Sequence, residues 1–252
     1  MNEHEKKLSK WDILFVVLTA SLVLVIPLAA IICYHLQDKE TVMDPNEIMN
    51  SVVHIKVYQE ESTYPGEYYS RGQTWQGSGC FVTPDGVIMT ARHVLDESRA
   101  NIAKIEVTLR DGTVLEAKRW MRADNLDVGF IKVEIKDAPF LVFDDDPQEI
   151  GQDVWILGHP LGWDNNWSLT KGIISNLGRD CEGFFGQFLM LQADSASYPG
   201  NSGGPMVDED GEIVGVLVGG IRGTECLSYV SPGDMCKEWM DVFVQWLECV
   251  DA

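Results

Sequence analysis

Ser202 is the residue with the clearest chemical potential, because it lies in PGNSGGP at residues 199–205. Glycine loses more backbone freedom on folding than other residues, so three glycines in this stretch indicate a backbone that a side chain would disturb. Pro, Gly, Asn and Ser also favour ordinary turns between strands. The alternative is a tight bend with converging amide N–H groups, which would make Ser202 a nucleophile beside an oxyanion hole.

A serine nucleophile needs a general base, because its hydroxyl is weakly nucleophilic at neutral pH. His93 is the best candidate among the five histidines, since it follows a hairpin and an apolar strand in GSGCFVTPDGVIMTARHVL. Asp127 precedes the apolar run VGFIKV and could hold the imidazole in the required tautomer. Asp124 is the weaker alternative, because it stands farther from that run. The residue types therefore predict a triad of His93, Asp127 and Ser202.

Short β-like runs must position these residues. From Met49 onward, apolar runs alternate with turn signals such as PDG at 84–86, which predicts an all-β fold of antiparallel barrels or sandwiches. The segment 233–252 breaks the pattern, because apolar residues such as Trp239 and Phe243 recur at helical spacing. We expect a helix there that packs one face on the body of the protein; a membrane-surface or partner-binding stripe is the alternative.

The run at 13–34 carries no charge. As a helix it would reach roughly 33 Å at about 1.5 Å per residue, enough for a hydrocarbon core of about 30 Å. A cleaved signal peptide is the alternative, but the run is longer than a typical apolar signal region of about 7–15 residues. Lysines precede the run, so we expect a cytoplasmic tail at 1–12, a transmembrane anchor at 13–34, a linker at 35–47 and the remainder outside the cytoplasm.

The formal net charge of −20 argues against a nucleic-acid partner. The acidic clusters DDD at 144–146 and DEDGE at 208–212 are typical of solvated turns. A preference for basic substrate segments is the alternative use of this charge.

The six cysteines form no Cys-x-x-Cys pair and no Cys/His cluster, so we expect no metal site and no cofactor. Cys33 falls in the expected anchor, and Cys80 lies in an apolar strand as a small buried hydrophobe. Disulfide pairing among the other four stays open; these are Cys181, Cys226, Cys236 and Cys249.

The motifs resemble, in order, those of trypsin-like serine proteases of the HtrA/Deg type in the chymotrypsin superfamily. They are GSGCFVTPDGVIMTARHVL, DNLDVGFIKV, GHPLGWDNNWSLTKGIISNLGR and DSASYPGNSGGPMVDEDGEIVGV. The resemblance covers roughly residues 48–240. It implies a chymotrypsin-like pair of perpendicular six-stranded β-barrels, one at 48–140 and one at 141–232, with the active site between them and the helix at 233–252 after them.

The resemblance also implies a role for each residue. His93 would be the general base, Asp127 the orienting acid and Ser202 the nucleophile. The amides of Gly200 and Ser202, with Asn201 between them, would form the oxyanion hole.

The substrate-binding residues follow from the same resemblance. Ala196 aligns with the floor of the primary specificity pocket, where it offers no counter-charge, so small or medium apolar side chains are expected before the scissile bond. The strand CLSYV resembles the one that pairs with an extended substrate by strand addition, with Leu227, Ser228 and Tyr229 lining the cleft.

The sequence departs from the family pattern at His159 and Tyr198, which replace the usual asparagines. We expect no PDZ domain after the protease segment, so that regulation would come from a partner, from oligomer contacts such as those of a homotrimer, or from neither.

Three functions stay in view. The first is a membrane-anchored serine endopeptidase that acts on unfolded or extended polypeptide segments outside the cytoplasm. The second is a dedicated processing protease with a narrow substrate, recognised through the aromatic loop at 63–75. The third is a non-catalytic binding module that keeps the protease fold.

Overall fold

A computed structural model of the chain describes residues 43–60, 74–95, 101–161, 165–181, 189–220 and 226–250. The chain divides into two units, 1–42 and 43–252, and only the second contains described residues. The expected tail at 1–12, the anchor at 13–34 and the aromatic residues at 63–73 lie outside the described residues. Within the described ranges, no helix is both long enough and apolar enough to cross a membrane.

The described chain starts with a short helix that leads into the first strand. Helix α2 (Pro45–Ile48) has Pro45 in its first turn, and the Asp44 carboxylate accepts a hydrogen bond from the Asn46 amide at 2.9 Å. An aspartate cap followed by proline is a typical helix start, because both compensate for amides that lack an intrahelical partner. A 3₁₀ turn, η1 (Met49–Ser51), then delivers the chain to β1.

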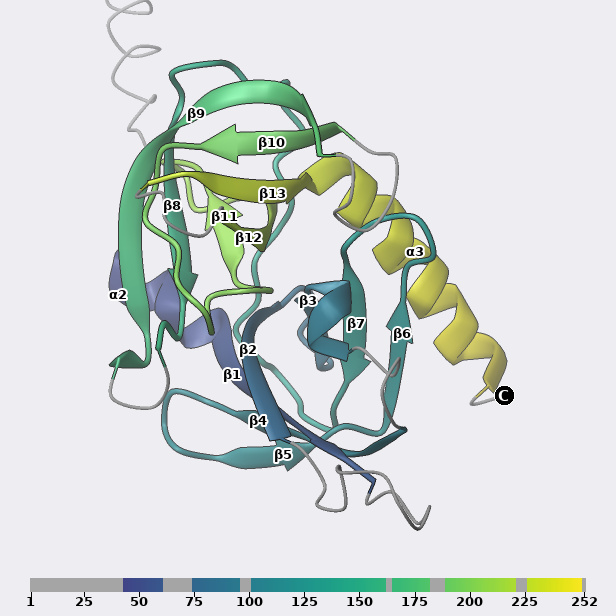
Figure 1. The fold of residues 1–252 in the computed structure, drawn as a ribbon. Helices are drawn as coiled ribbons and strands as arrows, with labels where there is room; N and C mark the ends of the chain where they lie inside the picture. The colour runs from purple at the N-terminus through teal and green to yellow at the C-terminus, as the bar shows by residue number, and fades with distance from the viewer. Residues whose placement is uncertain are drawn as a thin grey trace, which may run out of the picture. The chain divides into compact units, whose positions relative to one another are not determined.

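Seven antiparallel strands form the first half of the described chain (Figure 1). They run in the order β5-β4-β1-β2-β3-β7-β6. Their bounds are β1 (Val52–Gln59), β2 (Thr74–Phe81), β3 (Val87–Thr90), β4 (Ile102–Thr108), β5 (Val114–Glu116), β6 (Arg119–Arg122) and β7 (Gly129–Lys132). A second 3₁₀ turn, η2 (Arg92–Leu95), follows β3.

The expected count of six strands is wrong for this half, because one run is divided in two. Strands β5 and β6 lie at opposite edges of the sheet but are consecutive in the chain. Between them, the Ala117 amide donates to the Ile105 carbonyl of β4 at 3.0 Å, and the Lys118 amide donates to the Lys132 carbonyl of β7 at 2.7 Å. The sheet therefore curls until one continuous run bridges its two edges.

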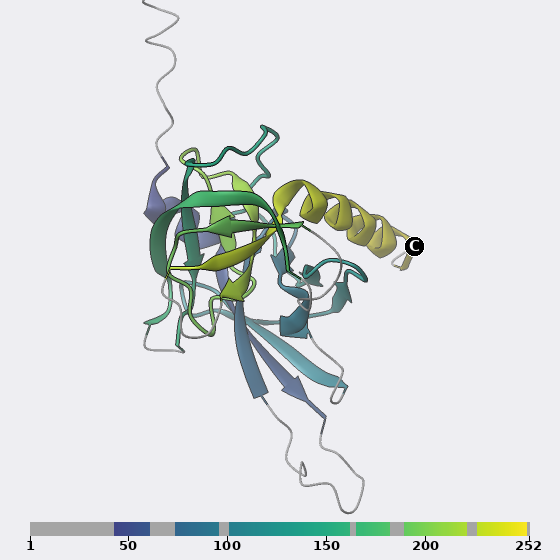
Figure 2. The same cartoon turned by 45° about the horizontal axis from the view of Figure 1, so that its top comes forward.

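The second half is a closed six-stranded barrel, as expected, in the order β10-β13-β12-β11-β8-β9 (Figure 2). Its strands are β8 (Asp153–Gly158), β9 (Ser168–Asp180), β10 (Leu189–Ala193), β11 (Pro205–Val207), β12 (Ile213–Gly220) and β13 (Ser228–Pro232). Each strand of the barrel therefore has a hydrogen-bonded strand on both sides over at least part of its length.

Helix α3 (Gly233–Val250) follows β13 directly and confirms the expected C-terminal helix. It buries one face through Cys236, Phe243 and Leu247. The Phe243 ring stacks on Phe130 of β7 with ring centroids 5.8 Å apart. A helix from the end of the chain therefore covers a strand of the first half and ties the two halves together.

All five cysteines in the described residues are free thiols. Cys80 and Cys236 are buried, which confirms Cys80 as a small core residue. Burial raises the pKa of both thiols, because it disfavours the charged thiolate.

Candidate active site

The pairing of β3 with β7 brings His93 and Asp127 together. Thr90 of β3 lies opposite Gly129 of β7. His93 follows Thr90 in the η2 turn and Asp127 precedes Gly129, so both side chains reach the same end of the strand pair. Antiparallel pairing thus explains why residues 34 positions apart meet.

Both carboxylate oxygens of Asp127 contact His93. The imidazole Nδ1 lies 2.7 Å from Oδ2, and the His93 amide donates to Oδ1 at 3.0 Å. Asp127 is fully buried, whereas the His93 side chain is 28% exposed. A buried carboxylate at Nδ1 places the proton there and leaves Nε2 as the basic nitrogen of the ring.

Asp124, the weaker sequence candidate, takes a different position. Its backbone carbonyl accepts a hydrogen bond from Arg92 Nη1 at 2.6 Å. The second half instead supports the acid through Ser231 of β13, whose hydroxyl donates to the Asp127 carbonyl at 3.2 Å. Sequence analysis missed Ser231, because nothing local in its sequence indicates a contact across the two halves.

Ser202 lies in the connection between β10 and β11, so it comes from the second half. Its hydroxyl donates to the Val218 carbonyl of β12 at 3.0 Å. Its own carbonyl accepts the Ser78 amide of β2 at 2.8 Å, which joins this connection to the first half. The structure therefore seats Ser202 against β2 and β12 and directs its hydroxyl to Val218.

The residues before Ser202 form a type II turn. The Asn201 amide donates to the Tyr198 carbonyl at 3.0 Å, Pro199 occupies the second position, and Gly200 has φ of +104° at the third. A Cβ on Gly200 would lie 2.3 Å from the His159 carbonyl oxygen. Glycine is therefore required at this position for both conformation and space.

The carbonyl groups of this turn face away from its amides. The Leu161 amide donates to the Pro199 carbonyl at 2.7 Å, and the Gly204 amide donates to the Asn201 carbonyl at 2.9 Å. No described peptide bond is cis, so the Gly200 and Ser202 N–H groups point opposite to those carbonyls. Within the described chain, neither N–H has a backbone hydrogen-bond partner. The carbonyl of each of these two peptides accepts a hydrogen bond, and the N–H on its opposite side can donate to a developing oxyanion.

Comparison with known proteins agrees with this geometry. Residues 77–216 match the trypsin-like peptidase domain. The chain belongs to the trypsin-like peptidase family, among its HtrA-type serine proteases.

Relatives of this HtrA-type chain include two bacterial proteins named "probable periplasmic serine endoprotease DegP-like". The protein of Chlamydia muridarum is 34% identical over 179 residues, which are 67% of this chain and 34% of that protein. The protein of Pseudomonas fulva is 34% identical over 190 residues, 67% of this chain and 38% of that protein. The chain thus spans about a third of the length of these curated relatives.

The fold is similar to that of solved HtrA-type proteases. The solved structure of "HtrA-type protease AlgWS227A with decapeptide" superposes with a TM-score of 0.69 at 21% identity, covering 81% of this chain and 67% of that one. A serine endoprotease from Yersinia pestis superposes with a TM-score of 0.63 at 24% identity, again covering 81% of this chain and 67% of the other. These likenesses show the shared all-β double-barrel fold.

In the HtrA-type chain, hydroxyl groups fix the segment around Ala196. Thr170 Oγ1 donates to the Ala196 carbonyl at 3.1 Å and lies 3.0 Å from Ser195 Oγ. Ser228 Oγ donates to the Ser195 carbonyl at 2.7 Å. Ala196 is half-buried, and the side chains that hold its segment are all uncharged.

The structure leaves no free strand edge at Ser228 and Tyr229, two of the three residues expected to pair with a substrate strand. Strand β13 is paired on both sides: Ser228 and Tyr229 lie opposite residues of β10 and also opposite Gly219 and Gly220 of β12. Their backbone groups are already used by the closed barrel. Leu227 instead packs its side chain on a small cluster of Met190, Val218 and Tyr229.

The end of β12 has the edge that β13 lacks. Strand β11 pairs with β12 only as far as Val216, and further backbone bonds join Leu217 to Gly203 and Gly204. Across the described residues, Val218–Gly220 has no strand on that side. This edge begins at Val218, whose carbonyl accepts the hydrogen bond of the Ser202 hydroxyl.

His159 is buried beside the turn that contains Gly200. Its Nδ1 accepts the Trp167 amide at 3.1 Å, and its ring meets His54 edge-to-face at 5.2 Å between centroids. Burial, followed by the charge of His54, lowers the pKa of His159 to about 3. His159 is therefore a neutral structural residue near neutral pH.

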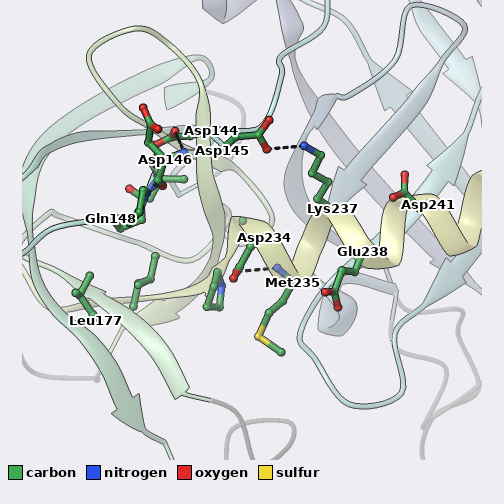
Figure 3. Close-up of a pocket in the computed structure, with 15 residues that line it drawn as sticks. Asp144, Asp145, Asp146, Gln148, Leu177, Asp234, Met235, Lys237, Glu238 and Asp241 are labelled. Carbon is green, nitrogen blue, oxygen red and sulfur yellow. Dashed lines mark hydrogen bonds and ion pairs between the residues drawn. The ribbon is translucent and has the colours of Figure 1, made fainter.

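A groove lies between the 144–148 segment and the start of α3 (Figure 3). The groove has a volume of about 550 Å³, and an apolar floor includes Leu191 and Val214. Lys237 forms an ion pair with Asp145 at 2.6 Å. The remaining charged side chains that line it are acidic, namely Asp144, Asp146, Asp234, Glu238 and Asp241.

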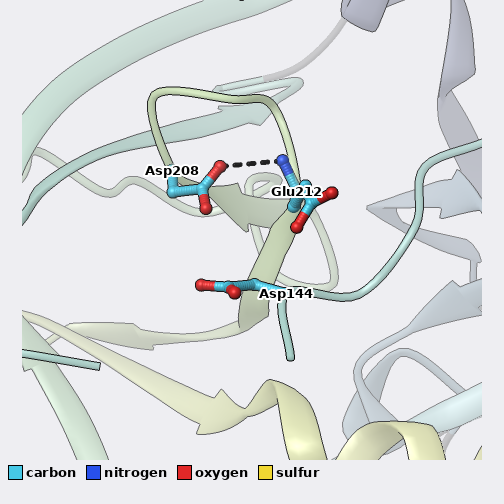
Figure 4. Close-up of side chains that lie close together, drawn as sticks. All are labelled: Asp144, Asp208 and Glu212. Atoms are coloured by element: carbon cyan, nitrogen blue, oxygen red, sulfur yellow. Dashed lines mark hydrogen bonds between the residues drawn. The ribbon is translucent and has the colours of Figure 1, made fainter. Parts of the chain in front are cut away.

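Three carboxylates meet on the other side of this segment (Figure 4). Oxygens of Asp144, Asp208 and Glu212 lie within 4.8 Å of one another. The expectation of a solvated turn is wrong for Asp208, which is 7% exposed and accepts the Asp210 and Glu212 amides. Burial, followed by repulsion from neighbouring acidic groups, raises the pKa of Asp208 and Glu212. The sequence signal, DEDGE, was present but indistinguishable from an exposed acidic turn.

Proposed function

We propose that the chain is a serine endopeptidase that hydrolyses peptide bonds in unfolded or extended polypeptide segments. Ser202 is the nucleophile, His93 the general base and Asp127 the orienting acid. The observation that carries the proposal is the two-point contact of buried Asp127 with the imidazole and amide of His93. Such a contact fixes both the tautomer and the orientation of a ring that must accept a proton.

The reaction begins when the Ser202 hydroxyl leaves the Val218 carbonyl and turns to His93 Nε2. Ser202 Oγ attacks the carbonyl carbon of the scissile bond while His93 takes the hydroxyl proton. The Gly200 and Ser202 amides stabilise the tetrahedral oxyanion. His93 then protonates the leaving amine, and a water molecule activated by the same ring hydrolyses the acyl-enzyme.

The substrate pairs with the end of β12. A polypeptide in extended conformation can add to the open edge of Val218–Gly220 through backbone hydrogen bonds, which do not depend on its side chains. The uncharged segment at Ala196 favours small or medium apolar side chains before the scissile bond. A requirement for a free, extended backbone selects unfolded segments over folded ones. The similar HtrA-type protease solved with a decapeptide supports a polypeptide ligand for this fold.

We place this activity outside the cytoplasm, with residues 13–34 as a transmembrane anchor and the N-terminus in the cytoplasm. The uncharged length of the run and the lysines before it support this topology. The names of the relatives, which include the word periplasmic, agree with it. Assembly as a homotrimer remains part of the same proposal.

The test is hydrolysis by the purified full chain of one protein in two forms, native and unfolded by reduction and carboxymethylation. We expect cleavage of the unfolded form and little cleavage of the native form, both abolished by Ser202→Ala. Ser51→Ala is the matched control, because Ser51 is a buried serine in η1 and no described hydrogen bond joins it to residues 199–204. Equal cleavage by wild type and Ser202→Ala would overturn the assignment, and a folded but inactive wild type would favour a binding module.

A further inference from the structure

We propose that Ser78 is a positioning residue, which holds the carbonyl groups of Gly200 and Ser202 and so orients the two amides of the oxyanion hole. This inference rests on the proposed function of the same site. Ser78 lies in β2, in the other half of the protein from the turn that it holds.

The backbone of Ser78 faces the nucleophile because β3 ends early. The last residue pair between β2 and β3 joins Gly79 to Thr90. At the next position the Ser78 amide donates to the Ser202 carbonyl at 2.8 Å, where a longer β3 would have continued the ladder. Thr90 Oγ1 donates to the Ser78 carbonyl at 2.7 Å and completes the backbone bonding at this end.

The Ser78 hydroxyl is placed between two backbone groups of the second half. The His159 amide donates to Ser78 Oγ at 3.0 Å, and Oγ lies 2.7 Å from the Gly200 carbonyl. An N–H group can only donate, so the single hydroxyl proton must point to Gly200. The Ser78 side chain is fully buried, which strengthens this bond and makes its loss costly.

Every carbonyl from residue 199 to residue 202 has a donor, and Ser78 supplies two of the four. Leu161 holds the Pro199 carbonyl and Gly204 holds the Asn201 carbonyl. Ser78 holds the Gly200 carbonyl with its hydroxyl and the Ser202 carbonyl with its amide. Substitution of the side chain removes the first of these bonds and leaves the second in place.

Close packing fixes the hydroxyl in this position. A Cβ added at Gly158 would lie 2.8 Å from Ser78 Oγ and 2.8 Å from Asn201 Oδ1. Gly203, with φ of +86°, lets its backbone approach so closely that a Cβ there would lie 2.3 Å from the Ser78 carbonyl oxygen. Both glycines allow backbone to pack directly on Ser78.

The variant Ser78→Ala removes the donor and leaves the Gly200 carbonyl and the His159 amide unpaired. The peptide that follows Gly200 is then held only by the Asn201 amide bond to Tyr198, so the Gly200 and Ser202 amides on either side of it are less firmly oriented. Loss of one oxyanion donor costs about 10²–10³ in kcat, so indirect disorder of the pair should lower kcat by roughly tenfold to a hundredfold. KM should change little, because Val218–Gly220 and Ala196 are not touched.

The decisive measurement compares two inhibitors. A peptide boronate forms a tetrahedral adduct that uses the oxyanion hole, whereas the product peptide of the same sequence does not require it. We expect Ser78→Ala to weaken binding of the boronate at least tenfold more than binding of the product peptide, since the oxyanion hole binds a tetrahedral oxygen preferentially. Ser78→Cys, which keeps the size and a weak donor, should fall between wild type and alanine. Ser51→Ala should behave as wild type.

A second readout does not depend on activity. Amide hydrogen exchange of the 196–207 segment, measured by mass spectrometry, should be faster in Ser78→Ala and unchanged in Ser51→Ala. The positioning role is overturned if hydrogen exchange is unchanged in Ser78→Ala, or if this variant loses equal affinity for the boronate and the product peptide. If the alanine variant does not fold, Ser78→Cys is used for the same comparison. A wild type without hydrolysis refutes the proposed function, while the exchange result still decides whether Ser78 orders the turn.

Discussion

His159→Asn should make the protein less sensitive to acid. His159 is fully buried beside the Gly200 turn, and its Nδ1 accepts the Trp167 amide. Asparagine offers a carbonyl oxygen that can accept the same N–H but cannot take up a proton near neutral pH. The variant therefore removes one titrating group with little loss of hydrogen bonding.

The sign follows from the protons bound in each state. The unfolded histidine has an ordinary pKa of 6.5, and burial lowers the pKa in the folded protein to about 3. Between these values the unfolded chain binds more protons, so the free energy of unfolding falls as the pH falls from 6.5 towards 3. A pH of 5 lies about 1.5 units below the pKa of the unfolded histidine. Protonation of the unfolded chain therefore lowers the free energy of unfolding by roughly 2 kcal/mol relative to neutral pH. Burial also lowers the pKa of the neighbouring His54, whose contribution has the same sign.

The assay is urea unfolding of both proteins, followed by tryptophan fluorescence at pH 7.5 and pH 5. Both proteins contain the same carboxylates, so the contribution of these groups to the pH dependence of unfolding cancels when the two proteins are compared. We expect the variant to lose about 2 kcal/mol less than wild type between the two pH values. An equal loss in both proteins would refute the inference that His159 is buried in its neutral form.

Three further outcomes are expected. Asp127→Asn should lower kcat by about 10⁴ with KM nearly unchanged in steady-state assays, because the amide favours the wrong tautomer of His93; an unchanged kcat would remove the assigned orienting role. Asp208→Asn should raise the free energy of unfolding at pH 7 by about 0.5–1 kcal/mol, because it removes repulsion with neighbouring carboxylates. Since burial raises the folded pKa of Asp208, that gain should shrink as the pH falls and the carboxyl becomes neutral; a gain that is constant with pH would argue otherwise. Cys80 and Cys236 should react with Ellman's reagent only after unfolding, since both thiols are buried with raised pKa values; their rapid reaction in the native protein would contradict this burial.

The sequence predicted the all-β fold and the C-terminal helix because their signals are local, whereas the double barrel followed from the resemblance to HtrA-type proteases. Short apolar runs, Asp-Gly turns and the one-faced pattern of α3 depend on neighbouring residues. The strand count of the first half failed for a reason that is not local: the run from 114 to 122 changes partner at Ala117 and Lys118. Only the three-dimensional course of the chain shows that one run serves both edges of a sheet.

The sequence motifs named His93 and Asp127, which the structure brings into contact, and Ser202, whose role as nucleophile stays a prediction. The strand CLSYV was expected to bind substrate, because its sequence does not show that Ser228 and Tyr229 of β13 are paired on both sides. Ser78 was not identified from the sequence, because its role depends on contacts with a distant part of the chain. Its GSG motif marks close backbone packing, but the two carbonyls it holds lie more than 120 residues away in the chain.

The most direct test of the proposed triad is covalent labelling of the native full chain with a fluorophosphonate, followed by mass spectrometry of the labelled peptide. A fluorophosphonate reacts with a serine only where a base activates the hydroxyl. We predict a single adduct on Ser202 that is lost in Ser202→Ala and strongly reduced in His93→Ala. An adduct on another serine, or labelling of Ser202 that is unaffected by the loss of His93, would contradict the proposed triad.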